Sequence, residues 1–137
     1  MATFNKIDAF VENLAEKVHN LGSDQLVVAL TNSAPIASNT VLANLTEISY
    51  TNLSSRNITT STSSQTSGTY KLVLTDLVLT ASGAVGPFRY VAIYNDTPTS
   101  PADPLIGWYD YGSSISLATG ETLTIDFDGT NGLLSIA

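Results

Sequence analysis

The sequence contains no cysteine among its 137 residues. Disulfide bonds, thiol nucleophiles and thiolate metal sites are therefore excluded. Charged residues are also scarce: they make up 12% of the chain, about half the usual share of a soluble domain. The basic residues are few and scattered: Lys6, Lys17, Arg56, Lys71 and Arg89. Because phosphate contacts need a basic patch, we expect no nucleic-acid partner.

Long apolar runs are absent as well. No stretch approaches the roughly 20 residues that a membrane-spanning helix needs, and residues 1–10, MATFNKIDAF, lack the basic and apolar segments of a signal peptide. We therefore expect a protein that is made in the cytoplasm and has no membrane partner. The net charge of −7 favours solubility and says little about the fold.

The chain begins with the pattern of an amphipathic helix. Apolar side chains recur at intervals of three and four residues, which places them on one helical face. Asn5 suits an N-cap, and Gly22 suits the residue that follows the last turn. Lys17 and His19 would then lie in the last turn, where positive charge is favourable. The sequence predicts a helix over residues 1–22.

From residue 24 onward the apolar pattern changes to the alternation of β-strands. Leu123, Ile125 and Phe127 alternate with polar residues. Short strands separated by turns are typical of an antiparallel sandwich. We predict one domain over residues 1–137, in which the helix precedes a mainly β, antiparallel β-sandwich of jelly-roll type over residues 24–137.

Two further segments carry information about the sandwich. Residues 69–81, TYKLVLTDLVLTA, predict a long strand that Asp76 interrupts, with a bulge as one explanation. Residues 54–68, SSRNITTSTSSQTSG, contain almost no large apolar side chains. Three interpretations remain for them: a polar strand, a mobile loop, or a contact segment that becomes ordered on binding.

Residues 86–97, GPFRYVAIYNDT, raise a specific question. In a strand, Phe88, Tyr90, Ala92 and Tyr94 would share one face, and Arg89, Val91, Ile93 and Asn95 the other. Neither face is typical of a solvent-exposed surface, so the second one rests either on the protein's own core or on another molecule. Arg89 has two candidate partners within the chain, Asp76 and Asp110, and a third possibility is a partner molecule.

Side chains capable of chemistry give no convincing active site. The sequence contains no Gly-x-Ser-x-Gly motif, so it offers no recognisable nucleophilic serine for His19 to activate. Asp96, Asp103 and Asp110 suggest paired carboxylates, but aspartate in loops more commonly caps its own backbone. The run from Asp126 to Asn131 departs from a calcium loop in the position of its glycine, and we interpret it as a turn. We predict no catalytic, cofactor-binding or metal-binding residues.

Aromatic side chains are the richest candidate set. They belong either to a core with a half-buried tyrosine row or to an interface, since Tyr, Trp and Arg are favoured at binding hot spots. The candidate interface residues are Phe4, Phe10, Phe88, Arg89, Tyr90, Tyr94, Trp108, Tyr109 and Tyr111.

Several strings along nearly the whole chain resemble one group of proteins. FNKIDAFVENLAEKVHNLG, LVVALTNSAP, QTSGTYKLVL, GPFRYVAIYNDT, PADPLIGWYDYGSS and GETLTIDFD follow in this order. They are similar to small virion structural proteins of tailed bacteriophages. The resemblance implies a non-enzymatic capsid decoration or cement protein on the exterior of the virion. Its implied partners are the major capsid protein and further copies of itself, as a homotrimer in preference to a dimer.

Two other functions stay open at this point. A phage tail or fibre protein would use the aromatic loops to bind glycans of the host surface. A hydrolase of cell-wall sugars would depend on carboxylates such as Asp96 and Asp110, but no glutamate lies near the aromatic cluster.

Overall fold

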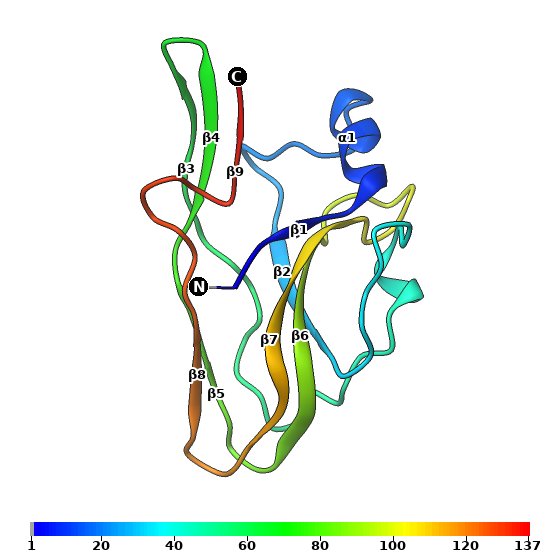
Figure 1. The fold of residues 1–137 in the computed structure, drawn as a ribbon, viewed down its shortest axis with the longest axis vertical. Helices are drawn as coiled ribbons and strands as arrows, with labels where there is room; N and C mark the ends of the chain where they lie inside the picture. The colour runs from blue at the N-terminus through cyan, green and yellow to red at the C-terminus, as the bar shows by residue number, and fades with distance from the viewer. Residues whose placement is uncertain (1) are drawn as a thin grey trace.

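The computed structural model describes residues 2–137, which form a mainly β fold with one α-helix near the N-terminal end of the described residues (Figure 1). The elements are β1 (Asn5–Lys6), α1 (Asp8–Ala15), β2 (Leu26–Thr31), the short 3-10 helix η1 (Leu42–Asn44), β3 (Thr60–Thr66), β4 (Thr69–Leu74), β5 (Leu77–Thr80), β6 (Val85–Asn95), β7 (Leu105–Leu117), β8 (Thr122–Ile125) and β9 (Leu134–Ile136).

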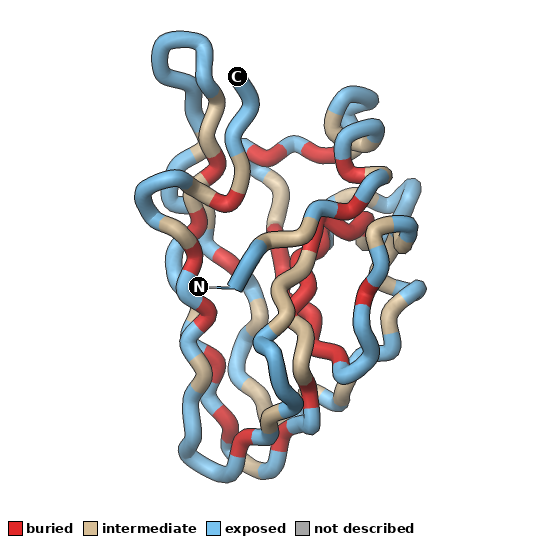
Figure 2. Tube along the Cα trace, in the orientation of Figure 1, coloured by how far each residue is buried: buried red, intermediate tan, exposed pale blue. Residues whose placement is uncertain are grey.

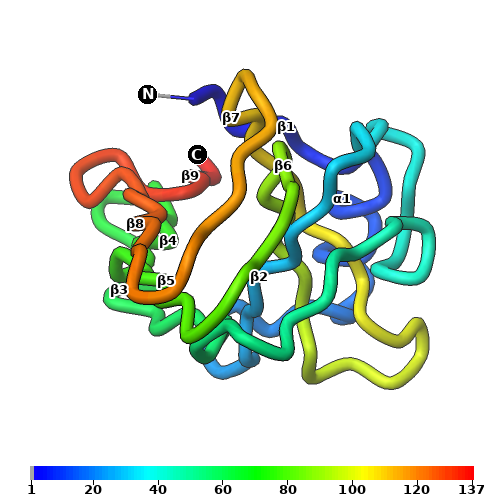
Figure 3. The backbone as a smooth tube through the Cα atoms, turned by 90° about the horizontal axis from the view of Figure 1, so that it is seen from below, coloured from blue at the N-terminus to red at the C-terminus, as the bar shows by residue number. Residues whose placement is uncertain are grey.

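The strands form two layers of antiparallel sheet. One layer is a four-stranded sheet in the order β1-β7-β6-β2. The other consists of the sheet β3-β4-β9 and the pair β5-β8, and the chain passes directly from β4 into β5. Seen from below, the two layers lie side by side with the core between them (Figure 3). The predicted antiparallel, sandwich-like β fold is confirmed.

The four-stranded sheet is covered on both faces along β2 and the end of β6. Every residue of β2 is buried, and so is every residue from Val91 to Asn95 in β6. The second layer covers one face, while α1 and the loops after β2 lie on the other side (Figures 1 and 3). The chain itself therefore covers Val91, Ile93 and Asn95 on the second face of the 86–97 stretch, whereas Arg89 stays partly exposed.

The outer edge of β2 is also covered, although not by a regular strand. Residues 47–58 run along it and make backbone hydrogen bonds. Ile48 N donates to Leu30 O at 3.0 Å, Val28 N donates to Arg56 O at 3.0 Å, and Ile58 N donates to Leu26 O at 2.9 Å. The apolar strand β2 is thus an inner strand in effect, which agrees with its complete burial.

The helix is shorter than the predicted span of residues 1–22. It covers Asp8–Ala15, and Ile7 rather than Asn5 is its N-cap. Asn5 lies instead in β1, where it pairs with Trp108 of β7. This tertiary strand pairing outweighs the local capping preference of Asn5. Lys17 has a φ of 68°, a left-handed conformation that ends the helix well before Gly22. Neither Lys17 nor His19 therefore lies in the last turn.

The predicted strand over residues 69–81 is two strands. Asp76 lies between β4 and β5, and its Oδ1 accepts a hydrogen bond from Phe127 N at 2.9 Å. Before Asp76 the chain pairs with β3 and β9, and after it with β8. The expected alternation is nevertheless present, since Leu72, Leu74 and Leu79 are all buried. The polar segment 54–68 contains an ordered strand, β3.

Among residues 2–137, no helix is both long enough and apolar enough to cross a membrane.

Candidate functional site

The nine candidate interface residues separate into two groups by burial. Phe10, Phe88 and Tyr94 are 4%, 1% and 5% exposed, so they belong to the core and offer no surface to a partner. The other six are partly or fully exposed: Phe4, Arg89, Tyr90, Trp108, Tyr109 and Tyr111. The alternative of a core with a half-buried aromatic row therefore accounts for part of the set.

Phe4 and Tyr109 hold β1 against the end of β7. Their ring centroids are 5.2 Å apart, and the Tyr109 ring lies 6.4 Å from that of Phe127 in the other layer. Burial, with a smaller contribution from Asp128, raises the pKa of Tyr109 to about 12. Trp108 is half-buried and pairs with Asn5 of β1. These aromatic residues have a structural role within the chain.

Tyr111 is the aromatic residue of the set that extends furthest into solvent, at 55% exposed. It lines a groove of about 320 Å³ between β7 and β8, together with Val91, Tyr109, Leu123 and Ile125. Apolar side chains of both layers, Val91 from β6 and Leu123 from β8, line this groove.

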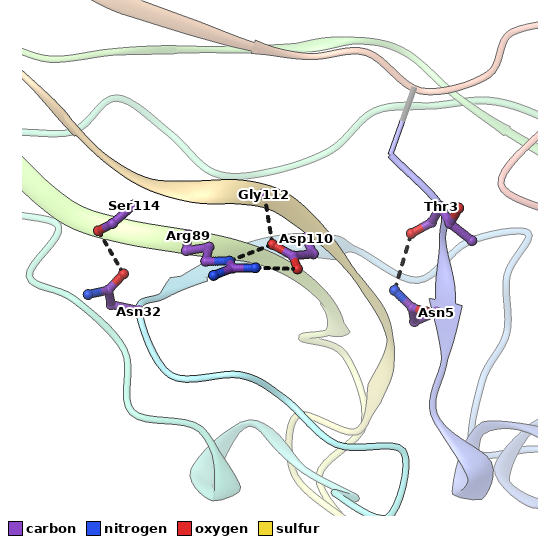
Figure 4. Close-up of polar contacts among 7 residues, drawn as sticks. All are labelled: Thr3, Asn5, Asn32, Arg89, Asp110, Gly112 and Ser114. Carbon is purple, nitrogen blue, oxygen red and sulfur yellow. Dashed lines mark hydrogen bonds and ion pairs between the residues drawn. The ribbon is translucent and has the colours of Figure 1, made fainter.

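Arg89 forms a two-point ion pair on the surface of the four-stranded sheet (Figure 4). Its Nε and an Nη donate to the two carboxylate oxygens of Asp110 at 2.8 and 3.0 Å. Gly112 N also donates to Asp110 Oδ1 at 2.8 Å. Arg89 and Gly112 hold the pKa of Asp110 below its usual range, and Asp110 raises that of Arg89. Of the two candidate partners within the chain, Asp76 and Asp110, Arg89 therefore pairs with Asp110.

An irregularity in β7 lies next to this ion pair. Tyr90 pairs with Asp110 and Phe88 with Ile115, so the two pairs are two residues apart on β6 but five apart on β7. The intervening residues 111–114 are all exposed. Such bulges redirect side chains and are common beside binding sites.

Two further polar contacts flank the ion pair (Figure 4). Ser114 Oγ donates to Asn32 Oδ1 at 2.9 Å, which ties the bulge to the loop after β2. Asn5 Nδ2 donates to Thr3 O at 3.2 Å beside β1. We call Asn32, Arg89, Asp110, Gly112 and Ser114 the β6–β7 polar cluster. Asn32 and Ser114 were not predicted, because nothing in their local sequence indicates that residues so far apart meet.

A second unpredicted cluster holds residues 47–58 in place. The Arg56 guanidinium lies 3.7 Å from the centre of the Tyr50 ring, and its Nη1 donates to Val28 O at 2.6 Å. Tyr50 OH donates to Glu47 at 2.7 Å, and burial followed by this bond raises the pKa of Tyr50. These contacts all lie within the chain, so the cluster is structural.

His19 lies in a buried polar network rather than in a catalytic arrangement. Its Nδ1 is 3.0 Å from Asn95 Nδ2, which also donates to Asp24 at 2.7 Å. A pocket of about 500 Å³ lies beside it and includes Ser63. The Ser63 hydroxyl is bonded to Tyr70 OH at 2.7 Å and not to His19. The described residues therefore contain no Ser-His-Asp arrangement around this histidine.

Among the remaining carboxyl groups, those of Asp96 and Asp103 lie close together. Asp110 is bonded to Arg89, whereas Asp103 lies in a loop with a φ of 50°. Burial, and then the neighbouring Asp96, raise the pKa of Asp103. Asp128 accepts the backbone N–H groups of Thr130 and Asn131 at 2.8 and 2.7 Å, which is the geometry of a turn.

No group of three or more metal-ligating side chains lies together in residues 2–137. Comparison with protein-family models, with curated proteins and with solved structures finds no match to this chain.

Proposed function

We propose that this protein is a virion structural protein of a tailed bacteriophage that binds the outer surface of the capsid as a decoration or cement protein. The sequence resemblance is one support for this proposal. The other is the β3–β4 hairpin, which is the single structural feature that carries it. A cement protein must contact neighbouring subunits of the capsid, and a projecting hairpin can make such a contact.

The hairpin extends beyond the rest of the second layer at one end of the molecule (Figure 1). Nearly all of its residues from Ser61 to Thr69 are exposed (Figure 2). No charged residue lies between Arg56 and Lys71. Contact with another protein therefore removes no charge of this segment from water, which lowers the cost of forming an interface.

A host-binding tail or fibre protein is the second candidate. It is favoured by the groove between β7 and β8, where exposed Tyr111 offers an aromatic ring beside polar backbone. An aromatic ring at the edge of a groove is a suitable surface for a sugar ring, because it presents an apolar face with a polar tip.

The two candidates are separated by co-sedimentation with capsids that lack the protein. A cement protein saturates at a copy number set by the symmetry of the shell. Binding to host cells or host polysaccharide that is lost in Tyr111→Ala, without capsid binding, would instead establish the tail or fibre function.

The role of the hairpin is tested by a pair of charge variants. Ser67→Asp places a carboxylate at the tip of the hairpin, where aspartate tolerates the left-handed backbone. Thr119→Asp adds the same charge at an exposed turn at the opposite end of the molecule (Figure 1). We expect at least about a tenfold loss of capsid affinity for Ser67→Asp alone, which corresponds to about 1.4 kcal/mol. Equal affinity of the two variants would exclude the hairpin as the contact.

A further inference from the structure

β3 is an exposed edge strand. It lies at the border of the sheet β3-β4-β9, and no strand among residues 2–137 pairs with its outer side. Five of its seven residues are exposed, and Thr60 and Ser63 are half-buried. By comparison, the outer edge of β2 is covered by residues 47–58, and β8 and β9 have only four and three residues. β3 is therefore an open edge of seven residues, longer than β8 or β9.

The turn at the tip fixes which backbone groups point outward. Ser67 and Gly68 have φ angles of 51° and 84°, which define a type I′ hairpin turn between Thr66 and Thr69. The turn hydrogen bond makes Thr66 a hydrogen-bonded partner of β4. Because bonding alternates along an antiparallel pair, Gln65 and Ser63 direct their N–H and C=O groups away from β4.

This edge lacks the usual protection against pairing. Natural edge strands commonly carry lysine, proline or inward-pointing charge. β3 has none of these, since its sequence is TSTSSQT. Its one irregularity is the register shift between Thr60 and Thr62, at the end remote from the tip. Residues 62–66 thus form a regular strand with free backbone donors and acceptors.

We propose that β3 pairs with β3 of a second copy of this chain, antiparallel and around a two-fold axis at Ser64. This register places Ser63 opposite Gln65 of the partner, so that their outward N–H and C=O groups form four backbone hydrogen bonds. Ser64 then faces Ser64, and Thr62 faces Thr66. The two three-stranded sheets become one sheet of six strands in the order β9-β4-β3-β3-β4-β9.

A second copy fits this edge for two reasons. Two chains of net charge −7 repel each other over most of their surfaces, but the β3 edge brings together hydroxyl and amide side chains alone. Cross-strand pairs of threonine and serine are favourable in antiparallel sheets. A contact of this length buries little area, so we expect weak association at low concentration.

Disulfide crosslinking tests both the surface and the register. The chain contains no cysteine, so single cysteine variants give unambiguous products. Ser64 lies in a pair that is not hydrogen-bonded, where Cα atoms are about 4.5 Å apart, within the range of a disulfide. We expect Ser64→Cys to form a covalent dimer at least tenfold faster than Thr122→Cys, an exposed position on β8. Equal rates would overturn the proposal.

Charge variants provide an independent measurement on the uncrosslinked protein. Ser64→Lys places two ammonium groups opposite each other at the two-fold axis, whereas Thr122→Lys adds the same charge to β8. Sedimentation equilibrium up to millimolar concentration should show dimers for the parent protein and Thr122→Lys, and at least a tenfold weaker association for Ser64→Lys. A parent protein that remains monomeric throughout, or dimers unaffected by Ser64→Lys, would contradict the pairing. Neither result depends on whether the protein binds capsids.

Discussion

At the scale of single residues, the environment of His19 determines its protonation. Asn95 Oδ1 accepts a hydrogen bond from Thr97 N at 3.1 Å, which fixes the orientation of the Asn95 amide. Its NH₂ group then faces His19 Nδ1, so Nδ1 must be an acceptor and the proton resides on Nε2. A doubly protonated imidazole would direct an N–H group at the NH₂ of Asn95. The network therefore stabilises the neutral ring.

This network predicts a loss of stability in mild acid. Burial lowers the pKa of His19, and this effect exceeds the opposing influence of Asp24. Below the unfolded-state pKa of about 6.5 the unfolded chain binds a proton that the folded chain does not. The free energy of unfolding should therefore fall as the pH drops from about 7 toward 5.5, before most carboxylates titrate. Urea unfolding at each pH measures this decline.

The variant His19→Gln serves as the control for this decline, because it has no titrating group at the position. Its unfolding free energy should change less over the same interval of pH. An equal decline in both proteins would assign the effect to other groups.

Gly107 provides a second test at residue scale, because it allows β1 to approach β7. A Cβ atom there would overlap the Phe4 ring and lie 2.5 Å from Asn5 O. We expect Gly107→Ala to lower the free energy of unfolding by about 1–3 kcal/mol, the usual cost of overpacking. A Cβ at Gly129 meets no atom within 4 Å, so Gly129→Ala should change stability little. Thermal unfolding of the two variants gives the comparison.

At the scale of elements, α1 depends on its packing. An isolated helix of eight residues is not stable in water, so the tertiary contacts of its buried face must hold it. Phe10 is the buried residue of the helix, whereas its neighbour Val11 is 53% exposed. We expect Phe10→Asp to cost about 3–5 kcal/mol, and Val11→Asp less than about 0.5 kcal/mol. Equal melting temperatures would show that the helix contributes no packing energy.

The strands show which features of an element the sequence can predict. The alternation of Leu123 and Ile125 predicted a half-buried strand, and β8 is one, because a single contacting layer sorts side chains by a period of two. β2 and the end of β6 have both faces buried, so alternation could not reveal what covers them. The ends of α1 were unpredictable for another reason: the pairing of Asn5 with distant Trp108 competes with the local helical pattern.

At the scale of the whole molecule, the mainly β antiparallel fold followed from composition and turn spacing. The candidate site followed only in part. Phe88 and Tyr94 were predicted as interface residues because they are aromatic, yet both are core residues. Large aromatic side chains are favoured in cores and in interfaces alike, so residue type alone does not distinguish them. The pairing of Arg89 with Asp110 was among the anticipated choices. Asn32 and Ser114 were missed, since their contact depends on tertiary structure.

The whole molecule should also be insensitive to chelators. No group of three or more metal-ligating side chains lies together in residues 2–137, and Asp128 is occupied by turn hydrogen bonds. We expect EDTA to leave the melting temperature unchanged within error. A decrease of several degrees that added calcium reverses would reveal a metal site.

The position of β1 has a consequence for the order in which the protein folds. Asn5 and Trp108 are 103 residues apart in the chain, yet they meet in one pair of strands. During synthesis, the first strand and the helix beside it have no partner until most of the polypeptide has left the ribosome. Closing so long a loop is slow relative to forming a local hairpin such as β3–β4. β1 is therefore made well before its partner β7, yet it is among the last strands to reach its final place.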